Sequence, residues 1–244
     1  MTRSEIIKFL ILRSIGNFLI LFSLFGVIAT FGPTIYYEAL FRIGQARGVH
    51  YQVAEPVTKS SLGDVLKRHS GNSNSTFNSS SKVDLADVLS GAKEQILTPI
   101  DTQFDILIPK IGANARVFPN VDPSNPNIFL PILAKGVAQA KGSVFPGMLG
   151  NVYLFAHSTD NFWDVGRYNA VFYLIKDLVP GDSIVIFFEN QRYDYVVTGS
   201  KIVDPSNVSY LVNSQHQNRQ QLILQTCWPP GTTWKRLLVF AKPK

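Results

Sequence analysis

The stretch that decides the fold is QLILQTCWPPGTTWKRLLVFAKPK, residues 221–244, at the C-terminal end of the sequence. Two apolar runs flank a Pro-Pro-Gly-Thr-Thr segment, which neither a helix nor a central strand accommodates. Cys227 ends the first run, and Arg236 opens the second. Two strands joined by this loop would hold a thiol at the end of one strand and a guanidinium at the start of the next. The stretch therefore predicts β-structure with a candidate nucleophile beside a fixed cation.

Composition and charge narrow the class of protein. With 244 residues, 45% of them hydrophobic, and 14 prolines, the chain is expected to have a globular part with a real core and much β-structure. The formal net charge is +6, but the Lys and Arg residues are scattered, which argues against nucleic-acid binding. Cys227 is the only cysteine, so an intrachain disulfide and a cysteine-based zinc cluster are excluded. In an exported protein, a single unpaired cysteine indicates reactivity.

The N-terminal region has the pattern of a membrane anchor. Residues 15–31 are uncharged and rich in Leu, Ile, Phe and Val, and at roughly 1.5 Å per residue they nearly span a bilayer core of about 30 Å. A cleaved signal peptide is the competing interpretation, but the run is long for one and Phe31-Gly32-Pro33-Thr34 is a poor cleavage site. We predict an uncleaved signal anchor, residues 1–37, that crosses the cell membrane once. Its N-terminus is expected in the cytoplasm and the rest of the chain outside.

A stalk is predicted between this anchor and a folded domain. Residues 70–81 are a low-complexity Ser/Asn segment that cannot bury enough apolar surface to order itself, which indicates a flexible spacer. Residues 84–97 have apolar positions at rough helical spacing and predict a short amphipathic helix. The predicted layout is the anchor, a stalk at 38–97 and a folded domain at 98–244.

The folded domain is predicted to be mainly β. Short strand-like runs with turn residues between them occupy residues 104–108, 115–118, 151–156, 183–188, 193–203, 221–226 and 237–241. Residues 168–178 are the one good helical candidate. Seven or eight short strands with one or two helices indicate a closed β-barrel or a sandwich. There is no regular βαβ alternation and no Gly-rich phosphate loop, so nucleotide binding is not favoured.

One of the four histidines stands out as a candidate base. His157 ends the apolar run 151–156 and is followed at once by polar residues. A residue at a strand end is held by the core and faces the layer of loops where sites form. A thiol needs a base or a cation to become a thiolate near neutral pH. The alternative is that His157 is a partly exposed loop histidine without a function. The sole cysteine also lies at a strand end, however, and this favours a site that the two residues share.

Several separated segments resemble one family, in its order along the chain. They are NVYLFAHS at 151–158, TCWPPGTTWKRLLV at 226–239, IPKIG at 108–112, GVAQAKGSVFPG at 136–147 and FYLIKDLVPGDSI at 172–184. Over residues 104–242 the chain resembles the sortases, the cysteine transpeptidases of bacterial surfaces, and is closest to subgroups outside the housekeeping class. The fold implied by the resemblance is an eight-stranded closed β-barrel.

The resemblance also implies a catalytic set. Cys227 matches the nucleophile, which attacks the Thr–Gly carbonyl of a Leu-Pro-X-Thr-Gly-like sorting signal and forms a thioester. His157 matches the general acid and base, and Arg236 matches the arginine that stabilises the oxyanion or orients the substrate. The backbone N–H of Trp228 is a candidate second donor, and Thr226 a candidate for positioning the substrate or the arginine. The implied partners are surface proteins or pilins with sorting signals and an amine acceptor; no metal or cofactor is implied.

Three features depart from the family pattern. Ile223 stands where the family has a first Thr, a position we expect to be structural. Gln139 stands where many relatives have a second histidine, which puts an auxiliary role of that histidine in doubt. Residues 158–167 are aromatic and acidic, and with Trp228 and Trp234 they either shape a substrate groove or pack on the barrel surface.

Two rival functions stay open on the sequence. One is a cysteine peptidase that mainly hydrolyses its substrate; a Ser-x-Gly-Cys sequence is missing for an L,D-transpeptidase-like enzyme, and a papain-like protease has Cys before His. The other is a non-catalytic, membrane-anchored β-domain that binds a partner and in which Cys227 is a buried core thiol.

Overall fold

In the computed structural model, the described residues are 3–54, 94–158, 171–212 and 218–244. The predicted spacer at 70–81 and most of the predicted groove segment at 158–167 lie outside these residues. So does the first part of the helix predicted at 168–178.

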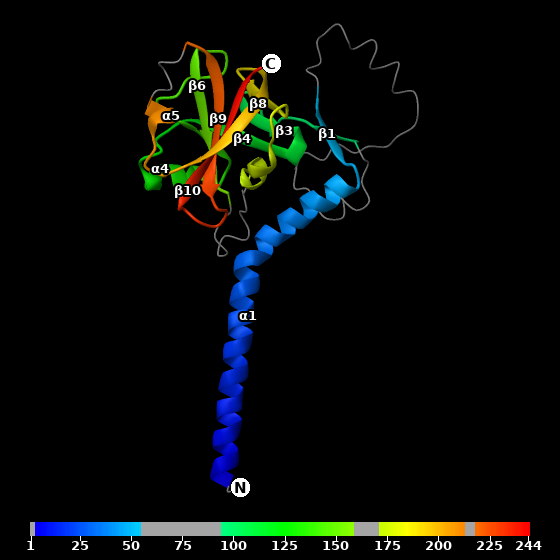
Figure 1. The fold of residues 1–244 in the computed structure, drawn as a ribbon, viewed down its shortest axis with the longest axis vertical. Helices are drawn as coiled ribbons and strands as arrows, with labels where there is room; N and C mark the ends of the chain where they lie inside the picture. The colour runs from blue at the N-terminus through cyan, green and yellow to red at the C-terminus, as the bar shows by residue number, and fades with distance from the viewer. Residues whose placement is uncertain (1–2, 55–93, 159–170, 213–217) are drawn as a thin grey trace.

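A closed β-barrel forms the centre of the molecule (Figure 1). Its strands follow one another around the barrel in the order β10-β8-β7-β3-β4-β5-β6-β9, with β9 and β10 pairing to close it. The strand bounds are β3 (Phe104–Ile108), β4 (Ala113–Val121), β5 (Val137–Ala140), β6 (Gly150–Phe155), β7 (Ser183–Phe188), β8 (Gln191–Val203), β9 (Gln220–Trp228) and β10 (Lys235–Pro243). The predicted eight-stranded barrel is confirmed.

Alternate residues of the strands pack into two separate apolar clusters. Leu222 and Leu224 of β9 belong to the cluster that fills the barrel, while Ile223 between them belongs to a second cluster on the outer face. The same alternation separates Leu237 from Leu238 in β10, because successive side chains of a strand point to opposite faces. The outer cluster is covered by short helices, so both faces of these strands are buried.

Short helices connect the strands. They are η1 (Pro109–Ile111), α4 (Pro126–Leu133), η3 (Tyr173–Asp177) and α5 (Ser209–Val212). The amide N–H of Asn127 donates to the Asn125 side chain, which caps α4, and Pro126 suits its first turn. The residues of α4 and α5 that pack against the outer cluster are Phe129, Ile132, Leu133, Tyr210 and Leu211.

The helix predicted at 168–178 is wrong in its type where the structure describes it. η3 is a 3-10 helix of five residues, and Leu178 after it has an extended backbone. Phe172, Ile175 and Leu178 are buried at a spacing of three residues. This spacing matches three residues per turn, whereas the predicted apolar face assumed the α-helical period.

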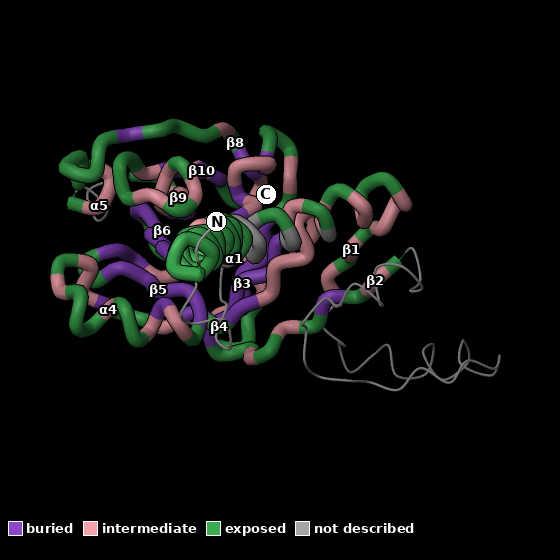
Figure 2. Tube along the Cα trace, turned by 90° about the horizontal axis from the view of Figure 1, so that it is seen from below, coloured by how far each residue is buried: buried purple, intermediate pink, exposed green. Residues whose placement is uncertain are grey.

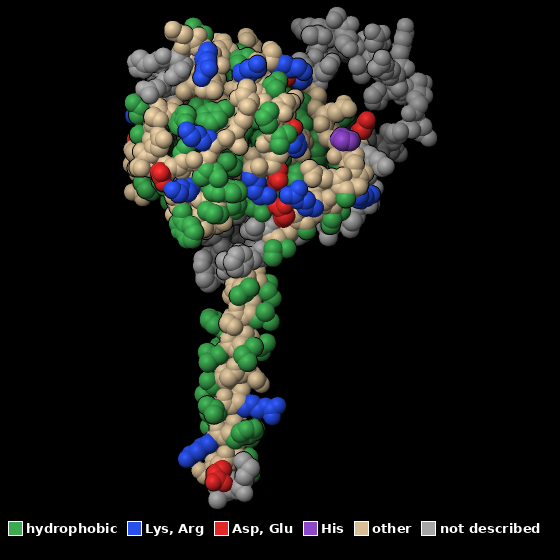
Figure 3. Space-filling model, in the orientation of Figure 1, with side chains coloured by type: hydrophobic (Ala, Val, Ile, Leu, Met, Phe, Trp, Pro, Cys, Tyr) green, Lys and Arg blue, Asp and Glu red, His purple; other side chains and the backbone are tan. Residues whose placement is uncertain are grey.

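The N-terminal helix α1 (Arg3–Ala46) continues past the predicted anchor, residues 1–37, as far as Ala46. Its stretch Arg3–Ile28 has a mean hydropathy of 2.0 and none of it is buried, so it is a candidate membrane span by length and composition. Hydrophobic side chains cover this part of the helix, with charged side chains near its N-terminal end (Figure 3). The N-terminal part of α1 leads away from the barrel (Figure 1), and seen from below it is exposed (Figure 2).

Two further strands lie inside the segment predicted as a stalk. β1 (His50–Val53) follows α1 and pairs in parallel with β2 (Glu94–Leu97). Tyr51 and Val53 pack with Leu97 on Leu107, Val185 and Phe187 of the barrel. Of the helix predicted at 84–97, residues 84–93 lie outside the described residues, and residues 94–97 form a strand instead. They find a strand partner and an apolar surface that the local pattern does not show.

Candidate active site

The pairing of β9 with β10 brings Cys227 and Arg236 together. The two residues are direct partners in the antiparallel ladder, so their Cα atoms lie about 4.5–5.5 Å apart and their side chains share one face. Cys227 is two residues beyond Gln225, and Arg236 two residues before Leu238, all on the outer face. The thiol is free and half-buried. The predicted neighbourhood of thiol and guanidinium thus follows from the strand register.

The pairing of β6 with β9 brings His157 to the same place. β6 runs parallel to β9 with Phe155 opposite Gln225, and the Ala156 amide N–H donates to the Gln225 carbonyl at 3.2 Å. Continuing this register by two residues brings His157 level with Cys227. His157 is half-buried, like the thiol. The strand register therefore places all three residues at the same end of the barrel.

Thr226 has a buried side chain that connects the end of β9 to the end of β6. Its side chain is 3% exposed, and its hydroxyl donates to the Ala156 carbonyl at 3.1 Å. The bond lies immediately before His157 on one strand and Cys227 on the other. Trp228 packs against the cluster inside the barrel and is half-buried. Trp234, in the loop, is 73% exposed and does not form part of the core.

The Arg236 guanidinium is held by two backbone carbonyls, one in the loop before β10 and one at the first residue of β10. Its Nη1 donates to the carbonyls of Thr233 and Lys235, both at 3.0 Å. A guanidinium has donors on three nitrogens, so these two bonds orient it and leave the donors of Nε and Nη2 for a developing anion. An anion formed at Cys227 would meet a cation already fixed in place.

A polar pair that the sequence did not single out lies under this site. The Tyr153 hydroxyl donates to Gln225 Oε1 at 2.6 Å, on the outer face of β6 and β9. Burial raises the pKa of Tyr153 above its ordinary range, although the charge of Arg236 acts in the opposite direction. Tyr153 is therefore a neutral donor, and it fixes the Gln225 side chain two residues before the thiol. A tyrosine and a glutamine in register on neighbouring strands become visible only once the pairing is known.

Gln139 has a structural role in place of the second histidine of many relatives. It is 1% exposed, its Oε1 accepts from the Asn120 amide N–H at 2.6 Å, and its Nε2 donates to the Ser143 hydroxyl at 2.8 Å. Asn120 belongs to β4, and Ser143 lies in the turn after β5. Among the described residues there is no group of three or more His, Cys, Asp or Glu side chains that could hold a metal ion.

A cysteine, a histidine and an arginine lie at one end of the barrel, and such an arrangement suits the chemistry of a cysteine nucleophile. The family model of the sortase domain matches residues 106–244, which is more than half of the chain. The chain belongs to the sortase family, whose members are cysteine transpeptidases. None of the curated protein sequences compared with the chain matches it.

Solved structures similar to the chain are sortases too. Sortase C from Clostridium perfringens SM101 is 23% identical with a TM-score of 0.45, over 57% of this chain and 68% of that one. Sortase C-1 from Actinomyces oris is 23% identical with a TM-score of 0.48, over 59% of this chain and 75% of that one. Clostridium perfringens sortase C with the C-terminal cell wall sorting motif is 26% identical with a TM-score of 0.46, over 57% of this chain and 69% of that one.

Proposed function

We propose that the chain is a membrane-anchored transpeptidase that cleaves a Leu-Pro-X-Thr-Gly-like sorting signal and transfers the acyl part to an amine. The observation that carries the proposal is the register of three strands. It brings the sole cysteine opposite Arg236 and level with His157. A family of cysteine transpeptidases supports the type of reaction.

In the proposed first half-reaction, His157 holds the proton of the Cys227 thiol, and the thiolate Sγ attacks the threonine carbonyl carbon of the Thr–Gly bond of the signal. The π electron pair of the C=O bond moves to the carbonyl oxygen, where the Arg236 guanidinium and the Trp228 backbone N–H stabilise the oxyanion. When the carbonyl re-forms, the C–N bond breaks, and His157 donates a proton to the leaving amine. The product is a thioester between the threonine carbonyl and Cys227.

In the proposed second half-reaction, an incoming amine attacks the thioester carbonyl. His157, neutral after the first step, takes a proton from this amine, and the thiolate of Cys227 leaves. The acceptor class is an amine of a cell-wall precursor or a pilin lysine. Water is the competing acceptor, since Cys227 and His157 are both half-buried rather than enclosed.

We assign Thr226 a positioning role in place of a direct contact with substrate. Its hydroxyl holds the end of β6 to the end of β9, one residue before the base and the nucleophile. The prediction was that Thr226 positions the substrate or Arg236, and its burial argues against a direct contact with the substrate.

We propose that α1 is an uncleaved anchor with its N-terminus in the cytoplasm and the barrel outside the cell membrane. The unburied apolar stretch Arg3–Ile28 supports the anchor, and the basic side chains at its start support the orientation. The proposed partners are sorting-signal proteins, whether surface proteins or pilins. The division into an anchor, a stalk at 38–97 and a catalytic domain at 98–244 stays a prediction.

The test uses the full chain in detergent, a library of quenched Leu-Pro-X-Thr-Gly-like peptides and an amine acceptor. We expect an amide product whose yield rises with the amine concentration and which disappears in Cys227→Ala. Free threonine-terminated peptide as the main product at saturating amine would favour the hydrolase. Cleavage that persists in Cys227→Ala would refute the mechanism, and a folded protein that reacts with no member of the library would favour the binding domain.

A further inference from the structure

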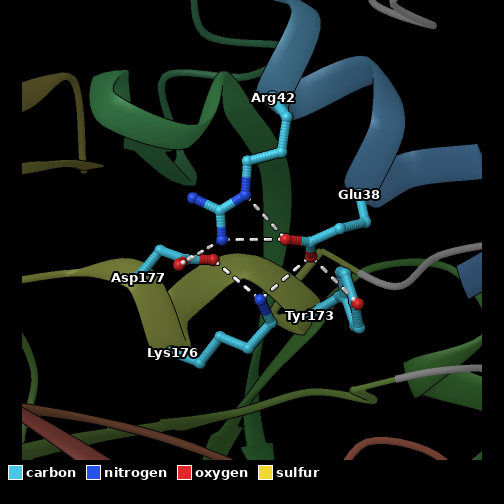
Figure 4. A network of polar contacts seen from close by, with 5 residues as sticks. All are labelled: Glu38, Arg42, Tyr173, Lys176 and Asp177. Atoms are coloured by element: carbon cyan, nitrogen blue, oxygen red, sulfur yellow. Dashed lines mark hydrogen bonds and ion pairs between the residues drawn. The ribbon is translucent and has the colours of Figure 1, made fainter. Parts of the chain in front are cut away.

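A ring of four charges joins the anchor helix to the barrel (Figure 4). Glu38 and Arg42 lie one turn apart on α1, and Lys176 and Asp177 are neighbours on η3. The four contacts alternate in sign around the ring: Arg42–Glu38 at 2.8 Å, Arg42–Asp177 at 3.2 Å, Lys176–Asp177 at 2.9 Å and Lys176–Glu38 at 3.0 Å. The Tyr173 hydroxyl also donates to Glu38 Oε2 at 3.1 Å.

The ring rests on a rigid part of the barrel. Phe172 and Ile175, next to the ring residues of η3, are 0% exposed in the barrel core. Three of the four charged side chains are themselves only 18–30% exposed. Hydrogen bonds with Lys176 and Arg42 lower the pKa of Glu38 despite its partial burial, and they keep it ionised. Each charge of the ring has two partners of opposite sign, which distinguishes the ring from an isolated surface ion pair.

A second attachment follows a few residues later. β1 begins shortly after α1 ends, and its Tyr51 ring lies against Gly112 at the end of η1. Tyr51 and Val53 also pack on the cluster of Leu97, Leu107, Val185 and Phe187. Residues 38–53 thus contact the barrel at two separated places, by charge at η3 and by apolar packing at β1. Two contacts restrict rotation, whereas a single contact would leave the barrel free to swing.

The attachment determines which end of the barrel faces the membrane span. The C-terminus, directly after β10, lies at the end of the barrel away from the N-terminal part of α1 (Figure 1). β10 therefore begins, and β9 and β6 end, on the side from which α1 departs. This is the end that carries Cys227, His157 and Arg236.

We propose that residues 38–53 are a docking arm that holds the barrel at a fixed height and with its thiol-bearing end turned toward the bilayer. Between Ile28, the last residue of the candidate span, and the ring at Glu38 lie about 15 Å of helix. The proposal rests on the proposed membrane anchoring and on no step of the proposed reaction. Its consequence is that a substrate is engaged close above the membrane surface, because the site does not swing outward on a flexible stalk.

The test inverts the charges of one side of the ring at a time. Glu38→Lys with Arg42→Glu keeps the charge and the intrahelical pair of α1, but makes both contacts with η3 repulsive. Lys176→Glu with Asp177→Lys does the same from the barrel. All four substitutions together restore an alternating ring, so the fourfold variant is the matched control for the two double variants.

The measurement is energy transfer from one dye on the barrel to acceptor lipids, with the full chain in nanodiscs. In a Cys227→Ala background, the dye is attached to Thr233→Cys beside the thiol end or to Lys244→Cys at the opposite end. Positions 233 and 244 flank β10, which has nine residues, so the two dyes differ in height by up to about 30 Å. We expect transfer at least twofold greater from position 233, no difference in either double variant, and recovery of the difference in the fourfold variant.

If the ring charges are unchanged and energy transfer from positions 233 and 244 is equal, or is absent from both, the proposed docking arm is refuted. A difference that survives both double variants, or one that the fourfold variant fails to restore, would refute it too. Energy transfer requires no catalysis, so failure of the arm is distinguishable from failure of the proposed transpeptidation. A soluble peptide assayed with Cys227 intact reports on the reaction separately.

Discussion

Replacing Thr226 by Val tests whether its hydroxyl aligns the base with the nucleophile. Val keeps the shape of the side chain but removes the donor to the Ala156 carbonyl, in a place where only 3% of Thr226 is exposed. A buried acceptor that loses its donor costs about 1–3 kcal/mol, or roughly 3–10 °C in Tm for a domain of this size. A shift of about 1 Å between His157 and Cys227 would lower the rate by about 10²-fold. We therefore expect Thr226→Val to lower kcat/KM by about 10–100-fold.

The assay is peptide turnover together with thermal unfolding, on the full chain in detergent. Thr226→Ser is the matched control, because it keeps the hydroxyl and loses a methyl group. We expect it to retain most of the rate. If Thr226→Val is as active as the original chain, or if Thr226→Ser loses as much rate as Thr226→Val, the hydroxyl does not position the site.

Three other predictions follow from single contacts. Arg236→Lys should lower kcat by about 10²–10³-fold in the peptide assay. An ammonium cannot donate to two backbone carbonyls and also present two parallel donors to the oxyanion. An unchanged kcat would mean that the arginine has no part in the mechanism. Burial raises the pKa of Asp105 to about 7. The contribution of this group to the stability of the folded state is therefore fully present below about pH 4 and is lost as the pH rises through 7. The loss in free energy of unfolding is roughly 4 kcal/mol at most. The free energy of unfolding in urea, plotted against pH from 5 to 8, should fall less steeply in Asp105→Asn than in the original chain. An unchanged pH dependence would mean that the carboxyl is ionised throughout. Gly112→Ala adds a Cβ that lies 2.9 Å from the Tyr51 ring, at a φ of 62°. It should lower the Tm more than Gly142→Ala, where φ is 88° and the added Cβ meets no atom within 4 Å. Equal Tm values would mean that the Tyr51 ring does not lie against Gly112.

Most of the barrel was predictable because its strands carry strong local patterns. β3 and β7 have the predicted bounds, since apolar β-branched and aromatic residues end at Pro109 and at Glu189-Asn190. β5 was not among the predicted strands, because Val137–Ala140 is short and half alanine. It is a strand because β4 and β6 flank it and bury all four residues. Tertiary pairing outweighs local propensity there.

The site was predictable to the extent that its residues are rare or stand at strand ends. A sole cysteine, a histidine after an apolar run and an arginine before another one mark positions that a barrel can bring together. The contacts that support them were not predictable. Tyr153 and Gln225 are 72 positions apart, and Glu38 and Lys176 are 138 apart, so no periodicity connects either pair.

The ordered structure within the segment predicted as a stalk also depends on contacts between residues far apart in the sequence. A polar, Ser-rich composition predicts a spacer because such a segment buries too little apolar surface to offset the entropy of ordering the chain. It does not reveal that α1 continues to Ala46, or that Tyr51 finds an apolar surface on the barrel. These contacts change the expected role of residues 38–53 from a tether to an arm.

The most direct test of the central claim is the mass of the acyl-enzyme. The full chain is incubated with a Leu-Pro-X-Thr-Gly-like peptide without an amine, quenched in acid, digested and analysed by mass spectrometry. The account predicts an increase equal to the acyl fragment up to threonine, located on the peptide that contains Cys227 and removed by hydroxylamine. An adduct on any other residue, or cleavage without an adduct in a chain that still turns over the peptide, would contradict it.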